Sequence, residues 1–69
     1  MPLCMAANGE TRLIKRVGGT DKIRRFLESL GFTAGTSVSV ISEIAGNLIV
    51  QVKDARVAVS REMAEKIYI

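Results

Sequence analysis

The lysines and arginines of this chain are the residues best suited to binding a partner, and they are unevenly spread. Six of the ten lie between Glu10 and Glu28 together with three acids, and the other four are matched by four acids, so this stretch carries the net charge of +3. Such a surface is either solvated and internally paired, through Asp21 with Arg25 and Arg24 with Glu28, or faces an acidic partner. If a partner binds here, we expect it to contact Lys15, Arg16, Arg24 and Arg25.

The other reactive side chains are too few for a catalytic or metal centre. The chain has no histidine and a single cysteine, Cys4. A zinc site takes about four ligands, and a Ser-His or Cys-His nucleophile pair needs an imidazole, so none of these can be built. The Gly18-Gly19-Thr20 segment lacks the Gly-Lys-Ser/Thr ending of a phosphate-binding loop and is interpreted as a tight connection. We therefore predict no enzyme, no metal site and no cofactor.

The element that must present Arg24 and Arg25 is a helix from about residue 21 to residue 30. Thr20 is suited to the N-cap position, and Gly31 is suited to the left-handed residue that ends a helix. Between them, one apolar stripe follows helical spacing and consists of Ile23, Phe26, Leu27 and Leu30. We expect this stripe, Phe26 included, to pack into the core, and the bases to lie on the outward face.

Short strands and closely spaced turns make up most of the remaining chain. β-Branched or alternating segments predict strands at residues 3–5, 11–17, 37–43, 48–52, 56–59 and 67–69. Turns are expected at Ala45-Gly46-Asn47 and Lys53-Asp54-Ala55, and Ser60 can cap a short helical turn that runs through Lys66. Five to six short strands hide their edges best in a small, partly closed barrel. The predicted fold is mainly β with one inserted helix, in a single domain over residues 1–69.

Composition also limits the compartment and the partners. No apolar run approaches the roughly 20 residues that cross a bilayer, and the N-terminus lacks a basic leader region. We expect a cytoplasmic protein without a membrane segment, in keeping with a lone cysteine. Nucleic acid is not favoured as a partner, because a charge of +3 is modest and at most two of the three aromatic residues are free to stack on bases.

The end of the helix and the strand that follows it resemble a known family. The signature stretch of the FeoA family is similar to Leu27-x-x-Leu30-Gly31-Phe32-x-x-Gly35-x-x-Val38-x-Val40, and residues 46–50, 56–59 and 64–67 agree in the same order. These are small accessory proteins of bacterial ferrous-iron uptake. The resemblance implies an SH3-like β-barrel that acts with the membrane ferrous-iron transporter FeoB. Ala34 stands where the family often has proline, and the histidines that some relatives carry are absent.

The predicted function is that of a non-enzymatic cytoplasmic accessory protein that docks on the transporter FeoB and modulates it. Two alternatives come from other classes: a nucleic-acid-binding small barrel, and a metal-binding regulatory module that uses Cys4 with carboxylates. Weak self-association into a homo-oligomer through exposed strand edges also stays open.

Overall fold

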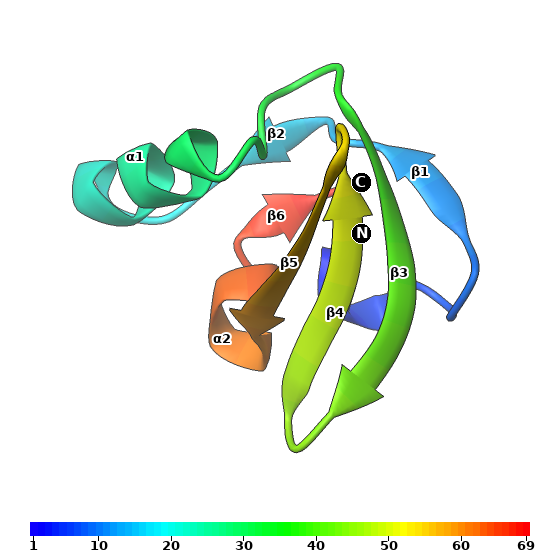
Figure 1. Ribbon diagram of the computed structural model, residues 1–69. Coiled ribbons are helices and arrows are strands. Elements are labelled where there is room, and N and C mark those ends of the chain that lie inside the picture. Colours follow the sequence, from blue (N-terminus) through cyan, green and yellow to red (C-terminus); the bar gives the residue numbers. More distant parts are fainter.

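The computed structural model describes residues 1–69 and is mainly β (Figure 1). In chain order the elements are η1 (Leu3–Met5), β1 (Thr11–Leu13), β2 (Arg16–Val17), α1 (Asp21–Ser29), β3 (Ser37–Ile44), β4 (Asn47–Val52), β5 (Ala55–Ser60), α2 (Arg61–Ala64) and β6 (Ile67–Tyr68). The strands form an antiparallel sheet in the order β1-β3-β4-β5 and a second sheet of β2 and β6. The prediction of a mainly β fold with an inserted helix and a short C-terminal helical turn is confirmed, but this turn ends at Ala64 and not at Lys66.

The β3-β4-β5 meander follows the alternation of apolar residues. The inward-facing side chains of these strands are almost fully buried, namely Val38, Val40, Leu48, Val50, Val52 and Val59. The β3–β4 hairpin turns through Ala45 and Gly46, whose φ angles of 52° and 82° are those of a type I′ turn. This turn matches the right-handed twist of its strands. A register shift between Val40 and Ser42 then brings Val40 opposite Val50, so that both lie on the inward face.

Residues 11–17 form two strands, so the prediction of one continuous strand is wrong. β1 pairs with β3, and β2 pairs with β6. The Ile14 N–H donates to the Thr36 carbonyl, whereas the next N–H, that of Lys15, donates to the Tyr68 carbonyl. The chain therefore changes sheets at Ile14. Because this bend closes the barrel, it also places the Ile14 side chain in the core.

The N-terminal segment also differs from its prediction, since Leu3–Met5 is a 3-10 turn and not a strand. The Met5 N–H donates to the Pro2 carbonyl at 3.1 Å. A strand would put Leu3 and Met5 on the same face, because side chains two residues apart share a side. The turn separates them instead, so that Leu3 is buried in the barrel while Met5 is exposed.

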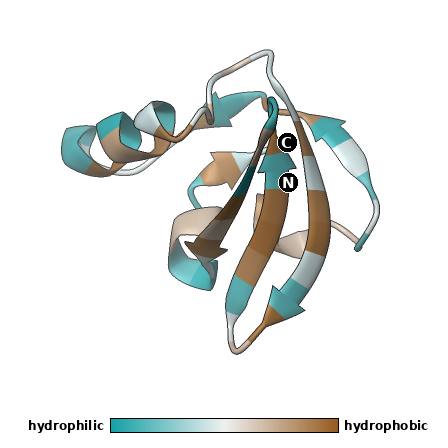
Figure 2. Cartoon of the chain, viewed as in Figure 1, coloured by the Kyte–Doolittle hydropathy of each residue, from teal (hydrophilic) through white to brown (hydrophobic).

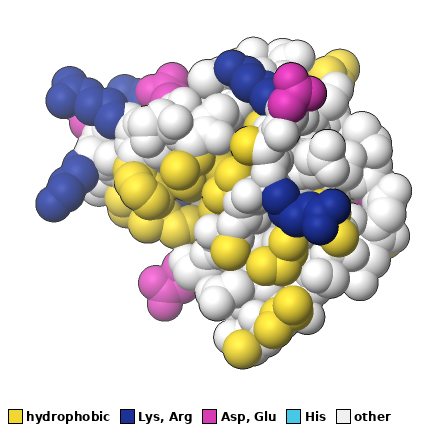
Figure 3. Space-filling view, viewed as in Figure 1, with side chains coloured by type: hydrophobic (Ala, Val, Ile, Leu, Met, Phe, Trp, Pro, Cys, Tyr) yellow, Lys and Arg dark blue, Asp and Glu magenta, His cyan; other side chains and the backbone are white.

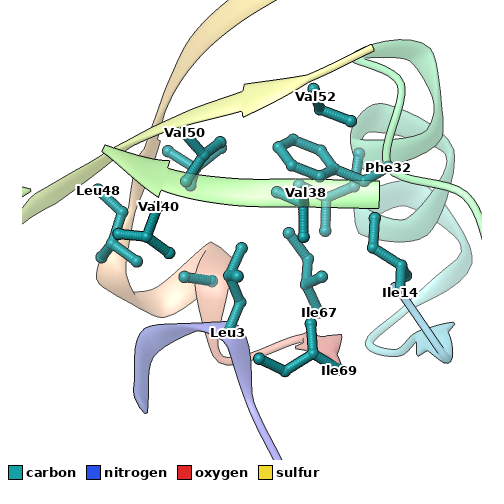
Figure 4. Close-up of a cluster of buried hydrophobic side chains, with 13 residues drawn as sticks. Leu3, Ile14, Phe32, Val38, Val40, Leu48, Val50, Val52, Ile67 and Ile69 are labelled. Atoms are coloured by element: carbon teal, nitrogen blue, oxygen red, sulfur yellow. The ribbon is translucent and has the colours of Figure 1, made fainter. Parts of the chain in front are cut away.

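The core is one cluster of buried side chains, all of them hydrophobic (Figure 4). The two ends of the chain close it together: Leu3 comes from η1, and Ile67 and Ile69 come from the C-terminal segment. Met1 and Ile69 exchange backbone hydrogen bonds, so the termini lie side by side (Figure 1). Burial of apolar surface in this cluster is the main stabilising contribution in so small a fold.

Both helices begin at the residues that the sequence predicts as caps. Thr20 Oγ1 accepts a hydrogen bond from the Ile23 N–H at 3.3 Å, and Ser60 Oγ accepts one from the Met63 N–H at 3.2 Å. These caps satisfy backbone donors that have no partner within the helix. Each helix therefore starts directly at the end of the connection or strand before it.

Helix α1 ends in a Schellman motif, one residue earlier than predicted. The Phe32 N–H donates to the Leu27 carbonyl, and the Gly31 N–H donates to the Glu28 carbonyl. Gly31 has a φ of 108°, a conformation that a residue with a Cβ adopts only with strain. Leu27 and Phe32 are both fully buried. The Leu-x-x-Leu-Gly-Phe stretch therefore ends the helix and seats two core side chains.

Candidate functional site

Helix α1 extends away from the barrel, and β2 is the strand it contacts most (Figure 1). Hydrophobic and hydrophilic residues lie on opposite sides of it (Figure 2). Leu27 is its only fully buried side chain, and Ile23 and Leu30 are partly buried against the core. Phe26 is 50% exposed, so the prediction that it packs into the core is wrong. Because the short helix lies on the outside of the barrel, only part of its apolar stripe contacts the core.

Cations border the exposed part of this stripe. Lys22 lies one helical turn before Phe26 and therefore on the same side, and Arg25 precedes Phe26 directly. Both basic side chains are exposed, and neither forms an ion pair. Figure 3 shows hydrophobic side chains gathered along α1 and continuing toward the barrel, with basic side chains at the outer end of the helix. We call Lys22, Arg25 and Phe26 the Phe26 surface.

The predicted ion pairs of α1 are replaced by a different one. Arg24 Nη2 lies 2.7 Å from Asp21 Oδ1, one turn away in an i,i+3 arrangement, and both side chains are well exposed. The expected pairs of Asp21 with Arg25 and of Arg24 with Glu28 do not form. Because Arg24 takes the single acid of the first turn, Arg25 remains free to meet a partner.

Of the other two predicted contact residues, Arg16 is the first residue of β2 and Lys15 directly precedes this strand. The Arg16 guanidinium stacks over the Tyr68 ring, with its carbon 4.1 Å from the ring centroid. Such a cation–π contact contributes about 0.5–1 kcal/mol at an exposed site and fixes the direction of the side chain. Lys15 is exposed and forms no ion pair.

The structure therefore places the four predicted bases on two neighbouring elements and divides them into two kinds. Arg16 and Arg24 are each held by a partner within the chain, and Lys15 and Arg25 are free. Sequence reasoning missed Lys22 and the exposure of Phe26. The stripe gave no signal of this, since three to four apolar residues per two turns are typical of a helix face that packs on the core.

The chain's acids and its cysteine do not converge. Cys4 is only partly accessible and packs against the core. Nowhere do three side chains of cysteine, aspartate or glutamate come together in a way that could hold a metal ion. The surface has no enclosed pocket. Neither helix is long and apolar enough to cross a membrane.

Glu10 is the acid whose ionisation is clearly perturbed. The Ala7 backbone N–H donates to Glu10 Oε1 at 2.9 Å, and the Arg12 guanidinium pairs with the same carboxylate. The first interaction and then the second lower the pKa of Glu10 below its ordinary value, because both favour the charged form. These contacts tie the turn at residues 7–10 to β1 and indicate a structural role.

Comparison with known proteins identifies the family of this chain. The FeoA domain family matches residues 1–69 of the chain. The chain is 29% identical over 68 residues to a protein of Methanocaldococcus jannaschii described as an Fe(2+) transport protein A, a match that covers 99% of this chain and 83% of that protein.

Solved structures show the same architecture. FeoA of Stenotrophomonas maltophilia, solved with zinc and described as a prokaryotic SH3 domain protein, is 26% identical with a TM-score of 0.85 over 97% of this chain and 86% of its own. A manganese-dependent transcriptional repressor shares the fold with a TM-score of 0.90 at 22% identity, over all of this chain and 40% of its own length. The barrel is thus SH3-like, and the match over residues 1–69 shows that the chain belongs to the FeoA family.

Proposed function

We propose that this chain is a non-enzymatic accessory protein of ferrous-iron transport that docks on the cytoplasmic face of the membrane transporter FeoB. Membership of the FeoA family supports the transport role. The observation that carries the docking role is the half-exposed Phe26 on a helix that extends from the barrel, beside two unpaired bases. A surface without an enclosed pocket suits a macromolecular partner better than a small substrate.

The Phe26 surface has the composition of a binding hot spot. Aromatic and arginine side chains carry a large share of the binding free energy at protein interfaces, and Phe26 lies next to Arg25 in the chain. Lys15 extends the basic region just before β2. Arg16 and Arg24 are held in fixed directions by Tyr68 and Asp21, so they lose less conformational freedom when an acidic partner binds. We propose Lys15, Arg16, Arg24 and Arg25 as the cationic border of the interface and Phe26 as its apolar anchor.

The test is a calorimetric and NMR titration of the protein with the purified cytoplasmic region of FeoB from the same organism, with and without a GTP analogue. We expect Phe26→Ala to weaken binding about tenfold or more, in line with the loss of an interface anchor. Ile44→Ala is the matched control, because Ile44 is a similarly exposed apolar side chain at the far end of β3. Arg25→Glu is compared with Arg61→Glu on α2, which makes the same change of charge away from α1.

Three results would count against the proposal at different levels. If the unmodified protein does not bind the FeoB region in either nucleotide state, the proposed partner is wrong. If it binds and Phe26→Ala binds equally well, the partner stands and the docking surface is wrong. If Ile44→Ala weakens binding as much as Phe26→Ala, the effect is not specific to α1.

A further inference from the structure

Strand β5 is an edge of the four-stranded sheet, and its backbone pattern shows which groups face outward. β5 pairs with β4 in the register Ser60 with Asn47 through Ala55 with Val52, and the Arg61 N–H continues the ladder to the Gly46 carbonyl. In an antiparallel ladder, hydrogen-bonded pairs alternate with pairs that are not bonded. Counting back from Arg61 in this register, every second β5 residue bonds to β4, namely Ala55, Val57 and Val59. The backbone N–H and C=O groups of Arg56 and Ala58 therefore face away from β4.

These outward groups have no partner within the chain. No strand pairs with the far side of β5, and no turn, cap or side-chain hydrogen bond reaches Arg56 or Ala58. Both residues are exposed. An unpaired strand edge is a template for one more strand, and proteins usually protect such edges with proline, lysine, bulges or short length. β5 has six residues with no proline, lysine or bulge, and Arg56 is its single charged side chain, whereas the opposite edge strand, β1, has only three residues.

Apolar surface accompanies this edge. Val57 points to the inner side of β5 and is partly buried, and Met63 on α2, which contacts β5, is partly buried as well. Figure 3 shows hydrophobic side chains continuing from α1 toward β5. A strand added at the edge would place every second side chain on this inner side. Those side chains would be apolar, since they extend the apolar face of the sheet.

The nearby basic residues indicate which side chains the added strand would carry on its outer side. Arg56 is exposed on the outer side of β5 and forms no ion pair, and Lys22 and Arg25 on α1 are also unpaired. Cross-strand neighbours of opposite charge stabilise a sheet, and like charges destabilise it. The side chains of the added strand that alternate with the apolar ones would therefore be acidic.

We infer that the free edge of β5 binds an extended segment of a partner protein, with alternating apolar and acidic residues, as an additional strand of the sheet. Main-chain hydrogen bonds to Arg56 and Ala58 supply the pairing, and the alternation of side chains supplies specificity. The identity of the partner as FeoB rests on the proposed function, but the strand addition itself does not.

The decisive variant is Ala58→Pro. Proline lacks the N–H that we assign to pairing and is tolerated on an outward-facing position of an edge strand, so the fold should remain while a further strand can no longer pair. Ala58→Thr is the matched control, because it keeps the N–H and suits a strand. With the FeoB cytoplasmic region, we expect the unmodified protein and Ala58→Thr to bind alike, and Ala58→Pro to bind at least tenfold more weakly. In the unmodified protein, amide exchange of Arg56 and Ala58 should slow at least tenfold on binding.

A peptide measurement separates this inference from the proposed function. The probe is an acetylated and amidated peptide of alternating valine and glutamate, seven residues long like a typical strand, with a valine–lysine peptide as its control. If the FeoB region binds the unmodified protein, the experiment with the FeoB region tests the strand addition. Equal binding by Ala58→Pro, or unchanged amide exchange at Arg56 and Ala58, overturns strand addition but not the identity of the partner. If Ala58→Pro does not fold, exchange in the unmodified protein decides.

If the FeoB region does not bind the unmodified protein, the proposed function fails, and the two peptides test whether the β5 edge binds an added strand. Slowed exchange at Arg56 and Ala58 with the glutamate peptide alone supports the inference, and no change with either peptide overturns it. Protection of these amides that rises with the concentration of the protein itself would show that a second copy occupies the edge, which also overturns the inference.

Discussion

Strand β4 and helix α1 both carry a clear apolar pattern, but the molecule uses the two patterns differently. β4 buries every second residue almost completely, whereas the four-residue stripe of α1 buries only Leu27 and leaves Phe26 half exposed. β4 has a paired strand on each side and the barrel interior on one face. α1 lies outside the sheets (Figure 1). The apolar residues of β4 therefore stabilise the fold, and those of α1 that remain exposed are available for binding.

The largest effect on stability is expected for Val50→Asp, which tests whether the inward residues of β4 stabilise the fold. An unpaired carboxylate in the centre of the core costs several kcal/mol, which is comparable to the whole stability of a domain of this size. We expect the variant to be unfolded, as seen by loss of dispersion in its amide NMR spectrum. Gln51→Asp, on the exposed side of the same strand, should keep a dispersed spectrum. A cooperative thermal transition for Val50→Asp near that of the unmodified protein would contradict the assigned core.

The next largest effect is expected at Leu27, the one residue of α1 that behaves like β4. Leu27→Ala should lower the free energy of unfolding by about 2–4 kcal/mol, because it leaves a cavity between the helix and the barrel. Urea denaturation measures this change. Ile23→Ala, at a partly buried position of the same stripe, should have a smaller effect. A loss below about 1 kcal/mol at Leu27 would mean that α1 is not anchored where the structure places it.

Phe26→Ala should have the opposite effect to Leu27→Ala: it should weaken binding but change stability little. Because half of the side chain is already in water, we expect the free energy of unfolding to fall by about 1 kcal/mol or less. Urea denaturation of this variant beside Leu27→Ala ranks the two positions directly. If both variants lose the same stability, the division of α1 into an anchoring side and a binding side is wrong.

The smallest effect is expected at Glu10, which contributes by charge and not by burial. Its pKa is lowered by the Ala7 N–H and by Arg12, so its stabilising effect is present above the ordinary value of 4.5 and disappears as the pH falls through the lower folded value. Glu10→Gln should therefore melt slightly lower than the unmodified protein at pH 7, and the difference should vanish in acid. Melting temperatures across this pH range provide the test, and a constant difference would exclude the carboxylate as its source.

Much of the fold could be predicted because it depends on local signals. The caps at Thr20 and Ser60 use side-chain oxygens that bond to the next turn, and Gly31 ends α1 because it tolerates a positive φ. The β4–β5 alternation survives because paired strands with one buried face keep their register. Each of these features can be recognised from a few neighbouring residues.

The features that were missed depend on residues distant in sequence. The split at Ile14 follows from two sheets that compete for adjacent backbone groups, through Thr36 and Tyr68. The turn at Leu3 is favoured because it buries the Leu3 side chain at one end of the barrel. The predicted site was identified by charge alone, and the structure separates its paired bases from Lys15 and Arg25.

By itself, the sequence determined the family resemblance, the starts of the helices and the inward faces of the central strands, because each is encoded by spacing and by local backbone preference. Only the tertiary structure decided that Phe26 faces water and that the far edge of β5 stays unpaired. Phe26 faces water because α1 lies outside the sheets, and the edge of β5 stays unpaired because β6 pairs with β2. That pairing depends on contacts between the two ends of the chain, which no local pattern specifies.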